Sequence, residues 1–161
     1  MIRTYTVKDA DYIIHSHYDQ YHKEFQYDES FRNFIATSVQ GFIERGHKRE
    51  NIWIVELEGK QYGSISIKNV NDKTAQLGLF LIEQKVRGAG YGQQLIKIAI
   101  DYCKEMGYET IILWTNRELI TARRLYEKNG FQLIESRARF LSNKKLIEEC
   151  WELNLEGKRG N

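Results

Sequence analysis

Three alternate glycines, Gly88, Gly90 and Gly92, stand between a hydrophobic stretch and an amphipathic one. Glycines let the backbone turn tightly and let a phosphate approach the N–H groups without a Cβ in the way. A helix that starts directly after such a loop points its unpaired N–H groups and the positive end of its dipole at the same spot. Arg87 adds a charged donor. These residue types at this spacing predict a pyrophosphate site.

The spacing also limits which pyrophosphate ligand fits. A P-loop requires Lys-Ser or Lys-Thr after its last glycine, whereas Gly92 is followed by Gln93 and Gln94. The dinucleotide fingerprint places its third glycine one position later than this loop does. A glycine-rich loop is also compatible with a plain tight turn from a strand into a helix. The loop alone therefore does not identify a ligand.

The elements around the loop predict an α/β fold with a mixed sheet of about seven strands and about four helices. Period-two alternation or short apolar runs mark the strands, and apolar residues three and four apart mark the helices. Strands are expected at 2–7, 52–57, 62–67, 75–82, 110–114, 131–134 and 150–155. Helices are expected at 8–21, at 31–46, from the glycine loop to Gly107, and at 119–128. The run 110–114 is so apolar that both of its faces are expected to be covered.

Length and composition place all of residues 1–161 in a single domain. The 24 basic and 22 acidic residues nearly balance, which argues against a nucleic-acid partner. We find no apolar stretch long enough for a membrane span and no secretory signal. Cys103 and Cys150 form no CxxC pair, and two reduced cysteines in a cytoplasmic protein are the expectation.

Two motifs in series resemble the GNAT superfamily of N-acetyltransferases. Residues 87–92, Arg-Gly-Ala-Gly-Tyr-Gly, match its Q/R-x-x-G-x-G/A loop, and residues 122–131 match its second signature, A-x-x-L-Y-x-x-x-G-F. The runs 113–116 and 151–153, with His17 and Tyr21, are similar to the acetyltransferase domains fused to MarR-type regulators. The winged-helix DNA-binding part of those regulators is not found in this sequence.

The resemblance implies acetyl-coenzyme A as co-substrate. The backbone of Phe80, Leu81 and Ile82 would pair with the pantetheine arm where this strand parts from its neighbour, and Asn116 would contact the same arm. Tyr126 would lie near the thioester sulfur and protonate the leaving thiolate, since a phenol remains protonated at neutral pH. Without the motif, Tyr126 would be interpreted as a core tyrosine. The pyrophosphate would be held by Arg87, Gly88, Ala89, Gly90, Tyr91, Gly92 and Gln93.

The acceptor side is less constrained. His17 and Tyr21 are four residues apart on the first predicted helix and could line the acceptor site, although simple packing explains them equally well. Tyr27 and Trp53 are further candidates. The histidines do not stand at the spacing of paired helical metal ligands, so no metal is expected.

The general base is in doubt. Gln76 occupies the position, eleven residues before Arg87, where many members of the family carry a glutamate, and an amide cannot take a proton. Glu83 is the nearest acid, and it is equally compatible with a solvated loop charge. Residues 137–139, Arg-Ala-Arg, replace a histidine that many relatives of the fused type carry. We expect the acceptor to bind as the free amine. The alternative is that Glu83 acts as the catalytic base and receives the proton of the amine through a water chain.

The hypothesis from sequence is an N-acetyltransferase in which an amine attacks acetyl-coenzyme A directly, without a covalent enzyme intermediate. The acceptor could be a small amine, an antibiotic, a peptide N-terminus or a lysine. The alternative is a non-catalytic module that binds or senses acyl-coenzyme A, and a purely structural role would give no coenzyme A affinity. Residues 151–155 form a plausible edge strand through which two copies could pair as a homodimer.

Overall fold

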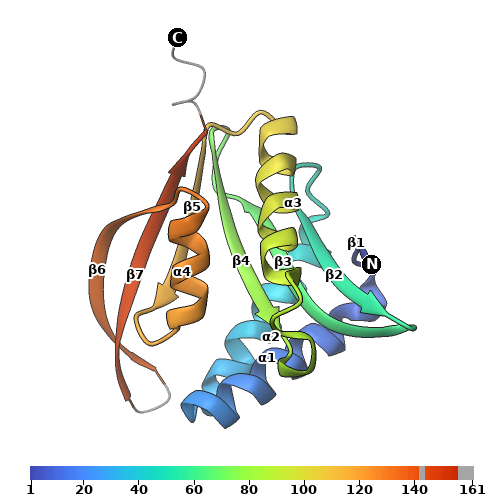
Figure 1. Cartoon of the computed structure of the whole chain (residues 1–161), viewed down its shortest axis with the longest axis vertical. Coiled ribbons are helices and arrows are strands. Elements are labelled where there is room, and N and C mark those ends of the chain that lie inside the picture. Colours follow the sequence, from blue (N-terminus) through green and yellow to red (C-terminus); the bar gives the residue numbers. More distant parts are fainter. Residues whose placement is uncertain (142–143, 156–161) are drawn as a thin grey trace.

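The computed structural model describes residues 1–141 and 144–155. In that part of the chain, seven strands form one mixed sheet in the order β1-β2-β3-β4-β5-β7-β6 (Figure 1). The strands are β1 (Ile2–Thr4), β2 (Asn51–Leu57), β3 (Lys60–Asn69), β4 (Thr74–Ile82), β5 (Thr110–Asn116), β6 (Gln132–Leu141) and β7 (Lys144–Asn154). Neighbouring strands run antiparallel, except β4 and β5, which are parallel.

Four α-helices and two 3-10 turns complete the described residues. They are η1 (Val7–Asp9), α1 (Ala10–Phe25), α2 (Glu29–Arg45), η2 (Gln84–Val86), α3 (Tyr91–Glu105) and α4 (Ile120–Lys128). The Asp28 carboxylate accepts from the backbone of Ser30 and so starts α2, and Gly46 ends it in the left-handed region at φ 49°. The predicted α/β class, with about seven strands and four helices, is confirmed.

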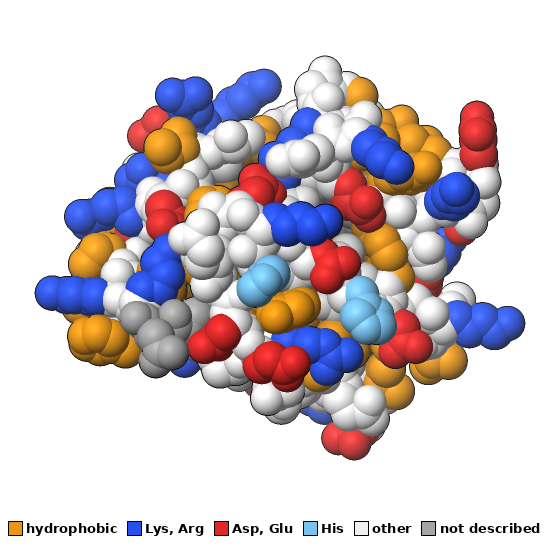
Figure 2. Space-filling model, turned by 90° about the horizontal axis from the view of Figure 1, so that it is seen from below, with side chains coloured by type: hydrophobic (Ala, Val, Ile, Leu, Met, Phe, Trp, Pro, Cys, Tyr) orange, Lys and Arg blue, Asp and Glu red, His pale blue; other side chains and the backbone are white. Residues whose placement is uncertain are grey.

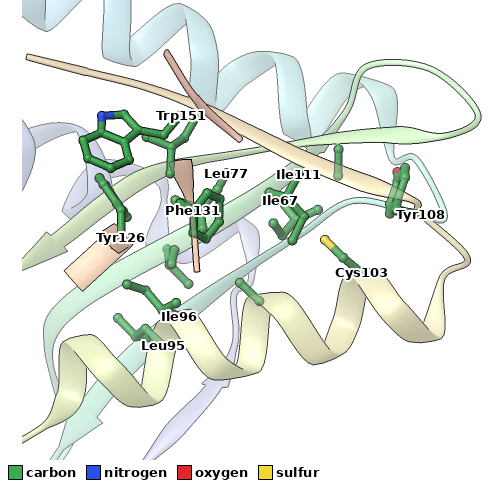
Figure 3. Packing of buried hydrophobic residues seen from close by; sticks show 14 of the residues in the cluster. Ile67, Leu77, Leu95, Ile96, Cys103, Tyr108, Ile111, Tyr126, Phe131 and Trp151 are labelled. Carbon is green, nitrogen blue, oxygen red and sulfur yellow. The ribbon is translucent and has the colours of Figure 1, made fainter. Parts of the chain in front are cut away.

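The sheet separates two hydrophobic clusters. The first lies under α3 and α4 and includes Ile67, Leu77, Tyr126, Phe131 and Trp151 (Figure 3). The second lies under α1 and α2 and includes residues such as Ile13, Tyr27 and Ile54. Because side chains alternate along a strand, β2, β4 and β7 each contribute to both clusters.

The turns follow local sequence closely. Glu58 and Gly59, both at positive φ (51° and 79°), close the β2–β3 hairpin in two residues. The element bounds differ more: β1 is shorter than predicted, α1 extends four residues beyond Tyr21 to Phe25, and β6 and β7 form a much longer hairpin. β6 and β7 extend further because each strand supplies hydrogen bonds to the other, and α1 extends further because its face packs against α2. Sequence periodicity shows neither effect.

Two expectations about the C-terminal strands were wrong. In β5, Ile111, Leu113 and Thr115 are buried, but the residues between them are half-exposed, so only one face is fully covered. β7 is an interior strand between β5 and β6, so residues 151–155 are not an edge strand. The edge on this side is β6, whose described side chains are exposed. Within the described residues, no helix is long and apolar enough to cross a membrane.

Candidate active site

The glycine loop leaves a row of backbone donors unpaired. Gly88 and Gly90 are left-handed (φ 84° and 88°), and α3 begins at Tyr91 directly after them. Among the described residues, no carbonyl or side-chain oxygen accepts a hydrogen bond from the N–H groups of residues 88–93. A short row of free N–H groups at the positive end of a helix dipole is suited to an anion such as a pyrophosphate.

Gly92 has a different reason to be glycine. Its φ is outside the left-handed region, but a Cβ there would lie 3.0 Å from Cδ1 of Leu125 and 3.5 Å from the ring of Phe80. The missing side chain therefore lets α3 approach α4 and β4 closely. Close packing, rather than a left-handed backbone, therefore explains this glycine.

Arg87 links the loop to α1. Its Nε donates to the carbonyl of Ile82 at 2.9 Å, and its guanidinium pairs with Glu24, near the end of α1, at 3.2 Å. Arg87, which we predicted to bind the pyrophosphate, is thus already paired with a carboxylate. An anion bound at the loop would compete with Glu24 for the Arg87 guanidinium.

β4 parts from β5 beside the loop. The parallel pairing ends at Gln76 and Ile112, and past that point the two strands diverge (Figure 1). β4 also carries a bulge there: Ser66 pairs with Gly78 and Ser64 with Leu81, which leaves Leu79 and Phe80 outside the ladder. Leu79 lies at φ 44°, and its carbonyl accepts from the Ser64 hydroxyl at 2.6 Å. The backbone of the predicted arm-binding strand is therefore irregular where the strands separate.

Tyr126 lies on the α3–α4 side of this gap between the strands. It is 5% exposed, with its ring 6.0 Å from Phe80 and 5.9 Å from Phe131. Its hydroxyl makes no hydrogen bond to any described residue. Burial, with a smaller contribution from Tyr21, raises its pKa above the ordinary range. The phenol is therefore a proton donor at neutral pH without an internal acceptor.

The helix that carries Tyr126 is anchored by an ion cluster that the sequence did not reveal. Glu149 of β7 is 1% exposed and accepts from Arg123 at 2.7 and 3.1 Å, from Arg117 at 3.3 Å and from Trp151 Nε1 at 3.2 Å. The bond to Arg123 fixes α4 against β7. The neighbouring Arg124 is exposed.

On the α1–α2 side, the structure brings His17 and Tyr21 together, with ring centroids 6.3 Å apart. His17 is 2% exposed, and burial lowers its pKa to about 4. Tyr21 packs against Phe31 and Tyr27 at 4.9 and 5.5 Å, and burial with the nearby Glu24 raises its pKa to about 12. Tyr21 also contributes electrostatically to the raised pKa of Tyr126, which belongs to the other hydrophobic cluster.

Tyr27 and Asn116 form one unit. The Asn116 amide donates to the Tyr27 hydroxyl, and that hydroxyl lies 3.5 Å from a Glu118 oxygen. Lys144 adds a bond to the carbonyl of Phe25 at 3.1 Å and approaches the same Glu118 oxygen at 3.5 Å. Asn116, expected on the cofactor arm, thus has a partner on the acceptor side in this structure. Glu118 was not anticipated, because the sequence gives no sign that residues 27 and 118 are neighbours.

Trp53 does not join the acceptor candidates. It lies in the α3–α4 cluster, edge-on to Tyr102 at 5.0 Å, on the opposite face of the sheet from Tyr27. The strand alternation of β2 decides this: Ile52 and Ile54 face α1 and α2, so Trp53 faces away. Trp53 therefore does not lie with His17, Tyr21 and Tyr27, contrary to our expectation.

Glu83 is half-buried rather than fully solvated. It ends β4 on the α1 side, where the Tyr12 hydroxyl donates to its Oε2 at 2.5 Å. Gln76 is paired in the ladder with Lys68 and Ile112, with no carboxylate in its place. Arg137, one of the residues 137–139 that stand where the sequence resemblance led us to expect a histidine, donates to Glu148 at 2.9 Å and stacks on Trp114 at 4.1 Å. It is bound to the sheet's own residues.

The surface around the site carries charges of both signs and one large hollow. Acidic and basic side chains alternate on the face seen from below, without a patch of one sign (Figure 2). A hollow of about 660 Å³ lies between α3 and β7 and begins at Gln93 and Asn129, whose amides bond each other at 2.9 Å in both directions. Tyr126 does not line it. Among the described residues, no group of His, Cys, Asp or Glu side chains could hold a metal ion.

Comparison with known proteins identifies relatives of this arrangement. A profile of the acetyltransferase (GNAT) family matches residues 11–131. N-acetyltransferase family 8 member 2 of Rattus norvegicus is 26% identical over 113 residues, which are 64% of this chain and 50% of that protein. The chain spans about half the length of the curated relatives it matches.

Solved structures share the fold. A GNAT-family acetyltransferase of Staphylococcus aureus Mu50 superimposes with a TM-score of 0.79 at 20% identity, covering 96% of this chain and 98% of the other. A Salmonella typhimurium protein, solved with its cofactor acetyl-CoA, has a TM-score of 0.74 at 15% identity and covers 96% and 93%.

Proposed function

Because the chain belongs to the acetyltransferase (GNAT) family, we propose that it transfers an acetyl group from acetyl-coenzyme A to an amine by direct attack. The observation that carries the proposal is the row of unpaired N–H groups from Gly88 to Gln93 at the start of α3. A pyrophosphate needs such donors, and residues 88–93 supply them from the backbone. The acetyl-CoA in the Salmonella neighbour supports the same ligand here.

We assign the pantetheine arm to the parted edge of β4. Beyond Gln76 this edge has no pairing with β5, so the backbone of Phe80, Leu81 and Ile82 is available to the amides of the arm. Asn116, at the end of β5, would exchange its bond to Tyr27 for one to the arm. Arg87 would likewise move from Glu24 toward the phosphates.

Tyr126 is assigned as the general acid. Attack by the amine nitrogen forms a C–N bond and breaks the C–S bond, and the departing thiolate takes the phenolic proton. The proton that the amine nitrogen loses passes to solvent, and solvent protonates the Tyr126 phenolate again. The support is that the Tyr126 side chain is 5% exposed, that its phenol is protonated at neutral pH, and that its hydroxyl is not bonded to any described residue. Orientation and electrostatic stabilisation supply the rest of the rate, as in other direct transfers.

The acceptor enters, in this proposal, from the α1–α2 side. His17, Tyr21 and Tyr27 lie on that side of the sheet, across the gap between β4 and β5 from Tyr126. Gln76 supplies no base, and one Glu83 oxygen already accepts from Tyr12. The amine would therefore bind as the free base, with its proton left in solution.

We also propose four features that concern the chain as a whole. We place residues 1–161 in one domain, since both hydrophobic clusters share one sheet. A cytoplasmic location and the likeness to domains fused to MarR-type regulators are carried over from the sequence. A homodimer formed by strand pairing would use β6 rather than residues 151–155, because β6 has the open edge. Light scattering after size exclusion measures that oligomeric state.

A thiol-release screen tests the proposed function. The chain is incubated with acetyl-coenzyme A and a panel of small amines, amino acids, aminoglycosides and peptides, and free thiol is followed over time. Thiol that appears only with particular amines is the expected result. Binding of acetyl-coenzyme A without amine-dependent thiol would favour the sensing module, and absence of binding would leave only a structural role.

A further inference from the structure

His17 is a buried side chain with one nitrogen that packing does not explain. It is 2% exposed, in the middle of α1, and its Nδ1 lies 2.8 Å from the carbonyl oxygen of Ile13. Its Nε2 is buried and has no hydrogen-bond partner among the described residues. An unpaired polar atom in a core costs stability, so such atoms are rare without a function.

The Ile13 carbonyl fixes the chemistry of this ring. A carbonyl oxygen can only accept, so Nδ1 must carry the proton and donate it. Burial holds the pKa of His17 at about 4, so the ring is neutral at physiological pH. Nε2 is therefore a free lone pair, available to accept a hydrogen bond and unable to donate one.

That lone pair lies at the parting of the strands. The Leu79 backbone, in the bulge of β4, is next to the His17 ring, and the Leu79 carbonyl is already bonded to Ser64. Tyr21 packs at 6.3 Å on one side of the ring and is close enough to Tyr126 to influence it. His17 therefore lies on the proposed acceptor side, near the gap that separates this side from Tyr126.

We propose that Nε2 of His17 accepts a hydrogen bond from an N–H of the acceptor amine and so turns the nitrogen lone pair toward the thioester. The inference rests on the proposed function and names its substrate class: an uncharged primary or secondary amine. The thioester oxygen is itself an acceptor, and the amides of the arm are assigned to β4, so the amine is the donor that this nitrogen fits.

An ammonium ion suits this place less well. The surroundings of His17 are Tyr21, Ile13 and the Leu79 backbone, and a cation taken into them would lose its hydration without a carboxylate partner. Free-base amines of low pKa gain further, because more of each is neutral near pH 7. Amines of one carbon skeleton graded by fluorination should therefore react faster at pH 7 as their pKa falls toward 7.

Kinetics of His17→Leu and His17→Gln test the inference. Leucine removes the acceptor, and kcat/KM for the amine should fall roughly 10- to 100-fold, the effect of losing one buried hydrogen bond. The Kd of acetyl-coenzyme A should stay within about twofold. Glutamine restores an acceptor oxygen and should recover part of the activity. His15→Leu, at an exposed position of the same helix, should change nothing.

Thermal melting separates function from packing. His17→Leu removes the unpaired Nε2 but also the Nδ1 bond to Ile13, so its Tm should stay close to that of the parent while its amine kinetics are impaired. If amine kcat/KM stays within about twofold in both variants, the inference is wrong and His17 is a packing residue. A fall in Tm with equal loss of acetyl-coenzyme A affinity would overturn it too. If the parent itself releases no thiol with any amine, the proposed function has failed first.

Discussion

The two sides of the parted strands are built in opposite ways. The glycine loop offers backbone N–H groups from one continuous run, residues 88–93, and needs few side chains. The α1 side is made of side chains that come from distant segments, such as His17, Tyr27 and Glu118. A backbone site is specified by local sequence, whereas a side-chain site exists only once the sheet and helices have packed. In our proposal the first side binds the co-substrate and the second side binds the acceptor, so the second can vary with the acceptor while the first stays the same.

The largest effect should come from the loop. Gly90→Val forces a β-branched residue into the left-handed region (φ 88°) and places its methyl groups among the free donors. Acetyl-coenzyme A binding, measured by calorimetry, should be abolished. Gly107→Val is the matched control, since it imposes the same kind of strain (φ 81°) at the other end of α3. Equal affinity in both variants and the parent would remove the loop from the cofactor site.

Tyr126→Phe should be next in size. Loss of the phenolic proton should lower kcat by roughly 10²–10⁴, the usual range for general acid catalysis, with acetyl-coenzyme A affinity unchanged. Tyr102→Phe removes a hydroxyl from the same cluster but far along α3, and should leave kcat intact. Unchanged turnover in Tyr126→Phe would reduce this residue to core packing.

These two variants also mark what sequence could and could not predict. β4, the loop and α3 are adjacent in sequence, so periodicity and glycine spacing sufficed to predict their order and the position of the loop. The bond from Tyr12 to Glu83 joins residues 71 apart, and that from Asn116 to Tyr27 joins residues 89 apart. Such contacts depend on how α1 crosses the sheet, which no local pattern encodes.

Strand order was beyond the sequence for the same reason. The alternation of Trp151, Leu153 and Leu155 is the same whether a strand is at an edge or inside a sheet, and β7 proved to be inside. Trp53 was expected on the acceptor side of the sheet but faces the other side. Side chains alternate along a strand, so a difference of one residue in β2 decides the face. Glu149 looked like one charge among many because its two arginine partners are 26 and 32 residues away.

Acid should destabilise the fold between pH 6.5 and pH 4 through the protonation of His17 on the α1 side. The folded-state pKa of His17 is lowered from 6.5 to about 4, so between these values the unfolded chain binds more protons. Stability is therefore full above pH 6.5 and falls by about 3 kcal/mol, at 1.36 kcal/mol per unit, as pH drops to 4. Denaturant melts of parent and His17→Gln measure this. A variant that lost as much stability as the parent across this window would contradict the assignment.

The smallest effect should be at Glu83. Its carboxylate already accepts the Tyr12 hydroxyl, so Glu83→Gln should change kcat/KM by less than about threefold. The rate should climb about tenfold per pH unit through neutrality, following the acceptor's own pKa, near 10.4 for a lysine-like amine. A plateau below pH 8 that disappears in Glu83→Gln would instead make Glu83 the base and move proton transfer onto the α1 side.

Measuring both products of the transfer, free thiol and acetylated amine, tests the central claim most directly. Acetyl-coenzyme A labelled in the acetyl group is incubated with the chain and the best amine of the screen, and free thiol and labelled product are counted together by mass spectrometry. We predict one labelled acetyl-amine for each thiol released, no label on the protein, and both products lost together in Gly90→Val. Thiol release without acetyl-amine, or a labelled protein that forms before the product, would contradict direct transfer across the parted strands.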